Sequence, residues 1–225
     1  MTEQSLPIFY SFRRCPYAMR ARMALVGSQQ HVQLREILLR DKPAHMVEVS
    51  PKATVPVMVL EGDEVLEESL DIMLWALKRN DPNQWLQPEQ GTPEEMLALI
   101  EEMDGSFKHH LDHYKYATLH AAEGEDPDAY AEKHRAAALE ILEGLEERLQ
   151  ANRFLFGSRI ALADVAIAPF IRQFANTDID WFNAQDLPKL QSWLQAFLAD
   201  DLFTGIMTKF PQWQAGDPLE VFPAA

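Results

Sequence analysis

The sequence is poor in cysteine, in basic residues and in long apolar runs, and each shortage excludes a class of protein. Cys15 is the one cysteine among 225 residues, so no disulfide can form within the chain. Lysine and arginine number 20 against 35 acidic residues, which gives a formal net charge of −15. A field of this sign repels phosphate backbones and argues against nucleic acid as a general partner. No apolar run approaches the roughly 18 residues of a membrane span, so we expect no membrane partner.

The remaining composition is that of an ordinary globular protein. Hydrophobic residues make up 47% and charged residues 24%, and 25.7 kDa is enough for one large core or two modest ones. The first twenty residues lack the basic segment followed by an apolar one that marks a secretory signal. Together with the single cysteine, this predicts a cytoplasmic protein.

Residues 1–79 alternate short apolar runs with helical spacing. The pattern predicts strands at 7–11 and 31–37, a helix at 18–27 that stops at Gly27, and a helix at 69–79. Between them, 54–69 is typical of a hairpin with strands at 57–60 and 64–66 and a turn at 61–63. This order predicts a small sheet with helices on its faces.

The rest of the chain has a different texture. Residues 80–92 are polar and rich in proline, which predicts a linker. Beyond it, a 3.6-residue apolar period predicts helices at 93–119, 127–151, 161–175 and 187–200. The fold class is therefore α/β plus all-α: an N-terminal domain over 1–79, a linker over 80–92 and an all-helical domain over 93–225.

Cys15 stands where a thiol can react. In "YSFRRCPYAMRARMAL" it follows a predicted strand and precedes Pro16, which favours the first turn of a helix. We expect the N–H groups of Tyr17 and Ala18 to point toward the sulfur, with the two preceding arginines adding positive charge. Such surroundings lower a thiol pKa from about 8.5 to roughly 3.5–7.5, which favours a thiolate. The alternative is a buried cysteine that only fills space.

Three motifs together carry a family resemblance. "CPYA" at 15–18, "TVP" at 54–56 and "EES" at 67–69 resemble the thioredoxin-like domain of cytosolic glutathione transferases, in particular the omega class and its cysteine-bearing bacterial relatives. "RRCPYAMRARM" and "ESLDI" also resemble the two-domain bacterial glutaredoxin. The resemblance implies the glutathione transferase fold, with a glutathione-binding domain over 1–79 and a second-substrate side over 93–225. It also implies a homodimer that uses glutathione as co-substrate and holds no covalent cofactor.

The resemblance assigns roles to most of these residues. Cys15 is the expected catalytic residue and forms a mixed disulfide with glutathione. Pro56 is expected to follow a cis bond, which turns the backbone of Val55 toward the cysteinyl part of glutathione. The hydroxyl and N–H of Ser69 are expected to hold the γ-glutamyl carboxylate, with Glu68 near the ammonium.

Two further glutathione-binding residues are assigned from a weaker resemblance to the family. Lys42, in "RDKPAHM", is expected to meet the glycine carboxylate, and Tyr17 to line the site with its backbone and ring face. The simpler alternatives are a solvated Lys42, an ordinary strand-initiating Pro56 and a Ser69 that only caps its helix.

The chain departs from the related patterns at two positions. Ala18 replaces the second cysteine of two-domain glutaredoxins, so glutathione itself must act as the resolving thiol. Ala161 replaces the Ser or Thr that caps a core helix in the superfamily, while Asp164 is retained. A lost cap typically costs about 0.5–2 kcal/mol, so this change concerns folding and not function.

Histidines at 109 and 113 share one helix face, as in H-E-x-x-H zinc sites. His110 takes a place between them, the catalytic glutamate is missing, and the sequence offers no obvious third ligand. We therefore expect no metal site, but a solvated face or a polar lining of the second-substrate cleft.

Three functions compete. The first is thiol transfer, deglutathionylation or reduction of a small-molecule or disulfide acceptor through a Cys15–glutathione mixed disulfide. The second is conjugation of glutathione to an electrophile, and the third is a non-enzymatic binding protein of the same fold. The combination of Cys15 with the predicted glutathione-binding residues argues against the third, because a binding protein needs no such set. We expect the first function, with the second as its alternative.

Overall fold

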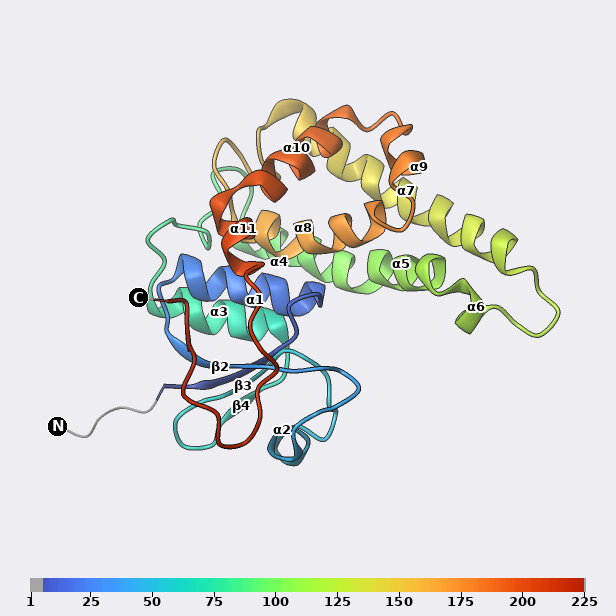
Figure 1. Cartoon of the computed structure of the whole chain (residues 1–225). Helices are drawn as coiled ribbons and strands as arrows, with labels where there is room; N and C mark the ends of the chain where they lie inside the picture. The colour runs from blue at the N-terminus through green and yellow to red at the C-terminus, as the bar shows by residue number, and fades with distance from the viewer. Residues whose placement is uncertain (1–5, 225) are drawn as a thin grey trace. The chain divides into compact units, whose positions relative to one another are not determined.

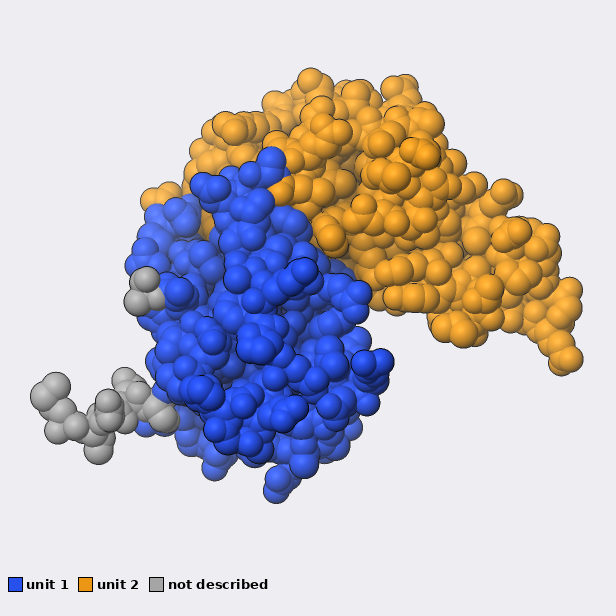
Figure 2. Space-filling model, viewed as in Figure 1, with its two compact units in different colours: residues 1–83, 199–225 blue, residues 84–198 orange. Residues whose placement is uncertain are grey.

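The computed structural model describes residues 6–224, and these divide into two compact units. Unit 1 contains residues 1–83 and 199–225, and unit 2 contains residues 84–198 (Figure 2). Within residues 6–224, no helix has both the length and the apolar character that a bilayer crossing demands.

Unit 1 is built on a five-stranded mixed sheet in the order β4-β3-β1-β2-β5. The strands are β1 (Ile8–Ser11), β2 (Val32–Glu36), β3 (Val57–Val59), β4 (Val65–Leu66) and β5 (Val221–Phe222). β1 runs parallel to β2 and antiparallel to β3, and β5 pairs antiparallel with β2. Because β1 and β2 are parallel, the chain must cross over between them, and helix α1 (Pro16–Gly27) makes this crossover.

The helices of unit 1 are α1, α2 (Ala44–Val49), α3 (Ser69–Arg79) and α11 (Asp201–Ile206). α1 and α3 pack side by side on the sheet, as Figure 1 shows. The predicted helix 69–79 has the bounds of α3, whereas α1 begins at Pro16, two residues before the predicted start. The hairpin turn between β3 and β4 is also as predicted: Gly62 has φ +83°, a conformation that glycine adopts without steric cost.

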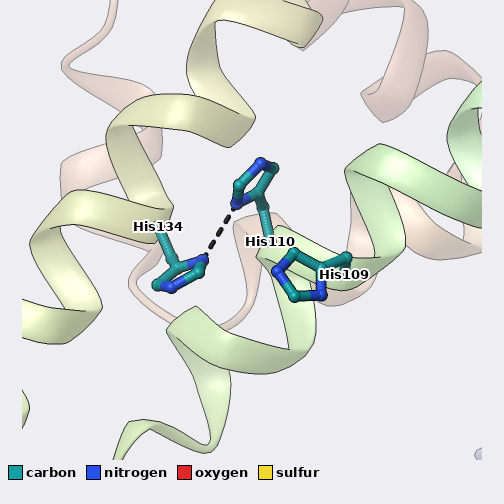
Figure 3. A group of neighbouring side chains, drawn as sticks. All are labelled: His109, His110 and His134. Carbon is teal, nitrogen blue, oxygen red and sulfur yellow. Dashed lines mark hydrogen bonds between the residues drawn. The ribbon is translucent and has the colours of Figure 1, made fainter. Parts of the chain in front are cut away.

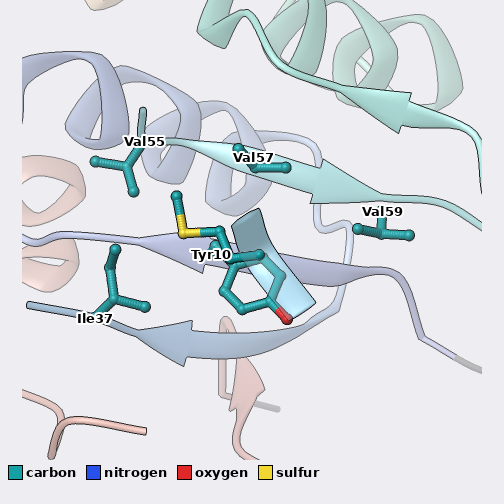
Figure 4. Packing of buried hydrophobic residues seen from close by; sticks show 6 residues of the cluster. Tyr10, Ile37, Val55, Val57 and Val59 are labelled. Atoms are coloured by element: carbon teal, nitrogen blue, oxygen red, sulfur yellow. The ribbon is translucent and has the colours of Figure 1, made fainter. Parts of the chain in front are cut away.

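The core next to Cys15 is a cluster of buried side chains contributed by β1, β3 and the adjoining segments. Tyr10 stands at its centre in Figure 4, with Val57 and Val59 on the neighbouring strand and Ile37 and Val55 at the edge. Burying an aliphatic side chain of this size contributes about 1.5–3 kcal/mol relative to leaving it in water. The cluster therefore fixes the segment that carries Val55.

A buried ion pair joins α1 to the sheet. Arg22 is fully buried; its Nε donates to Ser11 Oγ at 2.9 Å, its Nη1 to the carbonyl of Ile206 at 3.1 Å, and its Nη2 to Glu36. Burial lowers the pKa of Arg22, and the negative charge of Glu36 opposes that shift. Because Ile206 lies on α11, the same side chain also holds the C-terminal segment.

The predicted boundaries of the second domain need correction. Residues 199–225, expected in an all-helical domain over 93–225, group instead with residues 1–83, and β5 extends the sheet. The backbone N–H of Trp213 donates to the carbonyl of Glu36 at 2.8 Å. The expected linker 80–92 is divided between the units, and Trp85 within it is buried. The sequence could not show either result, because the two-residue strand β5 and the proline-rich segment 80–92 are too short for a repeating apolar pattern.

Unit 2 is helical. Its elements are α4 (Pro93–Glu102), the π-helical turn η1 (Met103–Phe107), α5 (Lys108–Lys115), α6 (Ala117–His120), α7 (Pro127–Ala151), α8 (Leu162–Ala175), α9 (Ile179–Asn183) and α10 (Pro188–Ala199). The bounds of α7 are those predicted. The single helix predicted over 93–119 is wrong, because η1 interrupts it and Tyr116, with φ −118° and ψ 35°, ends α5.

Asp164 organises the start of α8. Its Oδ2 accepts from the N–H of Ala161 at 2.9 Å, and its Oδ1 accepts from the N–H of Leu155 and from Trp193 Nε1, both at 3.0 Å. Burial raises the pKa of Asp164 to about 6, and these donors oppose the shift. Ala161 has no side-chain acceptor, so only the aspartate half of a capping box forms.

We expect Asp164→Ala to lower the free energy of unfolding by about 3 kcal/mol or more, because three buried N–H groups lose their acceptor and each typically costs about 1–3 kcal/mol. Urea unfolding followed by circular dichroism measures this. Glu143→Ala, at an exposed position of α7, is the control and should stay within about 0.5 kcal/mol of the parent. An unchanged urea midpoint in Asp164→Ala would contradict the role given to these three hydrogen bonds.

Candidate functional site

Cys15 is the N-cap residue of α1. Its backbone is extended (φ −79°, ψ 123°), and Pro16 follows in the first turn. The N–H of Cys15 donates to the carbonyl of Phe12 at 2.9 Å, and its own carbonyl accepts from the N–H of Met19 at 2.9 Å. The strand–turn–helix sequence thus ends in a helix that begins directly after the thiol, as the position of Pro16 predicts.

The thiol of Cys15 points toward a second motif. Its Sγ donates to the carbonyl of Val55 at 3.6 Å, across 40 residues of sequence, and the side chain is half-buried. We expected the first-turn N–H groups to meet the sulfur, but the Cys15 side chain makes no capping hydrogen bond to the described first turn of α1. In this conformation the sulfur faces Val55 instead.

The segment at Val55 has the backbone that the sequence predicts. The peptide bond between Val55 and Pro56 is cis, and both residues are buried. The structure therefore brings together Cys15, Val55 and Pro56.

Ser69 lies at the start of α3 and is linked to α1. Its side chain is buried, and its Oγ accepts from Arg20 Nε at 2.9 Å. The Arg20 guanidinium, itself on α1 and buried, lies 5.2 Å from the ring centroid of Tyr17. The predicted site residues Tyr17 and Ser69 are thus connected through Arg20, which the sequence analysis did not single out. The available signal was an arginine among small and apolar residues in "AMRARMAL".

Glu68 is the N-cap residue of α3, and its side chain is exposed. It forms an ion pair with Lys52, a second residue that the sequence analysis missed. The adjacent Glu67 accepts from Ser50 Oγ at 2.6 Å, so the two glutamates have different partners. Lys42 is exposed in the loop before α2, and its part in binding stays a prediction.

The two arginines before the thiol have partners of their own. The backbone N–H of Arg13 donates to Glu36 Oε1 at 2.7 Å, and its guanidinium Nη1 donates to the carbonyl of Met207 at 3.4 Å. The Arg14 guanidinium lies 5.2 Å from the ring centroid of Phe12. Arg13 is therefore directed toward the C-terminal segment of unit 1.

A second polar cluster lies in unit 2. His110 Nδ1 is 2.9 Å from His134 Nδ1, and ligand atoms of these two and of His109 all lie within 4.8 Å of one another (Figure 3). The sequence offered no third candidate beside His109 and His113; the structure places His134 of α7 next to the histidines of α5, which no spacing within α5 could reveal. Burial lowers the pKa of His134 to about 4, and the neighbouring imidazoles, first of all His113, add to the effect.

Comparison with known proteins gives a family match in each unit. Residues 9–85 match the family pattern "Glutathione S-transferase, N-terminal domain", and residues 127–196 match "Glutathione S-transferase, C-terminal domain". Glutathione S-transferase DHAR2 of Arabidopsis thaliana is 26% identical over 157 residues, which cover 69% of this chain and 64% of that protein, just under two thirds of its length. Probable glutathione S-transferase DHAR1, cytosolic, of Oryza sativa subsp. japonica is 25% identical over 193 residues, 84% of this chain and 82% of that protein.

The fold has a close counterpart among solved structures. A glutathione transferase family member from Pseudomonas fluorescens, crystallised with two glutathione bound, has a TM-score of 0.77 and 17% identity, and the match covers 92% of this chain and 94% of that one. This likeness shows the fold: an N-terminal mixed sheet of thioredoxin type and a helical domain. With both domain patterns matched, the chain belongs to the glutathione S-transferase family, a family of enzymes that use glutathione as co-substrate.

Proposed function

We propose that this protein is a cysteine-type, omega-like glutathione-dependent thiol transferase whose nucleophile is Cys15. The observation that carries the proposal is the position of its thiol, at the start of α1 and 3.6 Å from the carbonyl of Val55. A nucleophilic sulfur beside the backbone that precedes a cis-proline can react with the cysteinyl part of glutathione while that backbone binds the peptide.

The reaction has two exchange steps. The Cys15 thiolate attacks the glutathionyl sulfur of a mixed disulfide, forms Cys15–S–S–glutathione and releases the acceptor as a thiolate. A second glutathione thiolate then attacks the glutathionyl sulfur, forms oxidised glutathione and releases Cys15 as a thiolate. No second cysteine is needed, which suits a chain with one thiol.

The start of α3 suits the γ-glutamyl carboxylate. The N-terminus of a helix favours an anion through its unpaired N–H groups and its dipole. Because Ser69 Oγ accepts from Arg20 Nε, the Ser69 hydroxyl hydrogen is left to donate to a carboxylate. The buried guanidinium of Arg20 adds positive charge next to Ser69, at the start of α3.

The remaining contacts extend this assignment. The ammonium of glutathione lies near Glu68, whose exposed pair with Lys52 is of a type worth only about 0–1 kcal/mol and is easily rearranged. Tyr17 and Lys42 complete the proposed set, with Lys42 on the glycine carboxylate. The helical unit provides the acceptor side, and the name of the rice relative supports a cytoplasmic location.

Cys15→Ser is expected to abolish turnover of a small glutathione mixed disulfide while changing the Kd for glutathione less than about threefold, because Val55 and Ser69 bind the peptide separately from the sulfur. Parent and variant are incubated with oxidised glutathione, and their intact masses are measured by mass spectrometry with and without reductant. The parent should gain one reducible glutathionyl group and the variant none. Full turnover by the variant would refute the mechanism; conjugation of an electrophile without a mixed disulfide would favour a conjugating transferase.

Ser69→Ala tests the binding of the γ-glutamyl carboxylate. S-methylglutathione, which has no thiol to consume the reagent, should protect Cys15 from iodoacetamide. The variant should need a higher concentration, corresponding to about 1–3 kcal/mol for a lost hydrogen bond to a charged group. Ser192→Ala, at an exposed position of α10, is the control. Equal protection in Ser69→Ala and the parent, with equal alkylation rates in the absence of ligand, would remove Ser69 from the binding set.

We also propose that the protein is a homodimer, because closed two-fold pairs are the commonest assemblies of soluble proteins and the family resemblance implies one. Light scattering at micromolar concentration should give twice the chain mass of 25.7 kDa. A mass of one chain across that range would exclude the dimer.

A further inference from the structure

Histidine is concentrated in one part of unit 2. The chain has seven histidines, and five of them lie on α5, α6 and α7: His109, His110, His113, His120 and His134. α5 packs against α7, which brings the histidines of α5 to the one on α7. Neither the thiol chemistry nor the glutathione contacts proposed for unit 1 use this cluster.

Three of these side chains converge. Figure 3 shows His109 and His110 on one helix and His134 on the facing helix, with a contact between the last two. The Nδ1 atoms of His110 and His134 are 2.9 Å apart. One ligand atom from each of the three residues lies within 4.8 Å of the others. Their exposure is graded, since His134 is buried, His110 half-buried and His109 exposed, so the group opens toward solvent on one side.

Neighbouring rings hold this arrangement. His113 stacks on His134 with centroids 4.8 Å apart, and its Nδ1 lies 2.8 Å from the carbonyl of His109. Donation of an N–H to that carbonyl fixes the tautomer and orientation of His113, the ring that packs against His134. Tyr130 packs against the same buried imidazole, with ring centroids 4.6 Å apart.

We propose that His109, His110 and His134 bind one divalent first-row transition-metal cation of the Zn²⁺ type. The three donors are imidazole nitrogens, which suit Zn²⁺, Cu²⁺ and Ni²⁺, whereas Mg²⁺ and Ca²⁺ prefer oxygen ligands. Three protein ligands leave a fourth position for water or another small ligand on the exposed side. Coordination through Nδ1 of His110 and His134 places the N–H of each ring on Nε2.

The spacing is close to what such an ion requires. A tetrahedral ion at about 2.0–2.1 Å from nitrogen sets neighbouring nitrogens about 3.3 Å apart. The Nδ1 atoms of His110 and His134 are already closer than that, at 2.9 Å, and the widest separation in the group is at most 4.8 Å. Rotation of the exposed His109 side chain can close the difference without movement of a helix.

The experiment uses the full chain without a histidine tag and in a Cys15→Ser background, because a thiol also binds Zn²⁺. Calorimetric titration with ZnCl₂ should show one ion per chain with a Kd in the micromolar range or tighter. Co²⁺ should give the visible absorption bands of a low-coordinate nitrogen site. His109→Gln and His110→Gln should each raise the Kd for Zn²⁺ at least about tenfold.

His31→Gln, at an exposed position in unit 1, is the matched control and should bind Zn²⁺ as the background protein does. His109 is exposed, so its variant reports on binding even if changes at buried positions disturb folding. Absence of stoichiometric binding, or equal affinity in His109→Gln, His110→Gln and the control, would overturn the proposal. The result is independent of the thiol-transferase function, because Cys15 is absent from every protein tested.

Discussion

The buried ion pair between Arg22 and Glu36 is the interaction on which the position of the thiol depends. One carboxylate oxygen of Glu36 accepts from Arg22, and the other accepts from the backbone N–H of Arg13, in the turn that leads to Cys15. Removing one partner of a buried pair typically costs about 3–5 kcal/mol, because the other charge is left without compensation. The pair therefore holds β2, α1 and the turn before the thiol in one arrangement.

The same pair explains why the C-terminal segment belongs with the sheet. Arg22 also donates to the carbonyl of Ile206 on α11, and the backbone carbonyl of Glu36 accepts from Trp213. A fully buried guanidinium needs acceptors for its several donors, and α11 supplies one of them. Residues 199–225 consequently belong to unit 1 in three dimensions, although the residues of unit 2 lie between them and residues 1–83 in the sequence.

Local signals could be predicted from the sequence, and long-range pairings could not. Pro16 indicates where α1 begins, and the apolar period of 69–79 gives α3 its bounds, since both depend on a few adjacent residues. The hydrogen bond from Arg20 to Ser69 spans 49 residues and depends on how α1 packs against α3. The contact of His110 with His134 depends in the same way on the packing of α5 against α7, so spacing within α5 gave no third ligand.

The buried and half-buried polar groups of the described chain differ in how their hydrogen-bonding capacity is used. Arg22 and Asp164 each meet three partners of matching chemistry, which is what a buried charge needs for a purely structural role. His110 and His134 face each other through Nδ1, and two neutral rings can place only one hydrogen between those atoms. One nitrogen donates and the other accepts, while a third imidazole approaches the same point. With the hydrogen of each ring on Nε2 instead, both Nδ1 lone pairs point to the same place, which suits a cation, whereas the pairing of Arg22 with Glu36 is already complete.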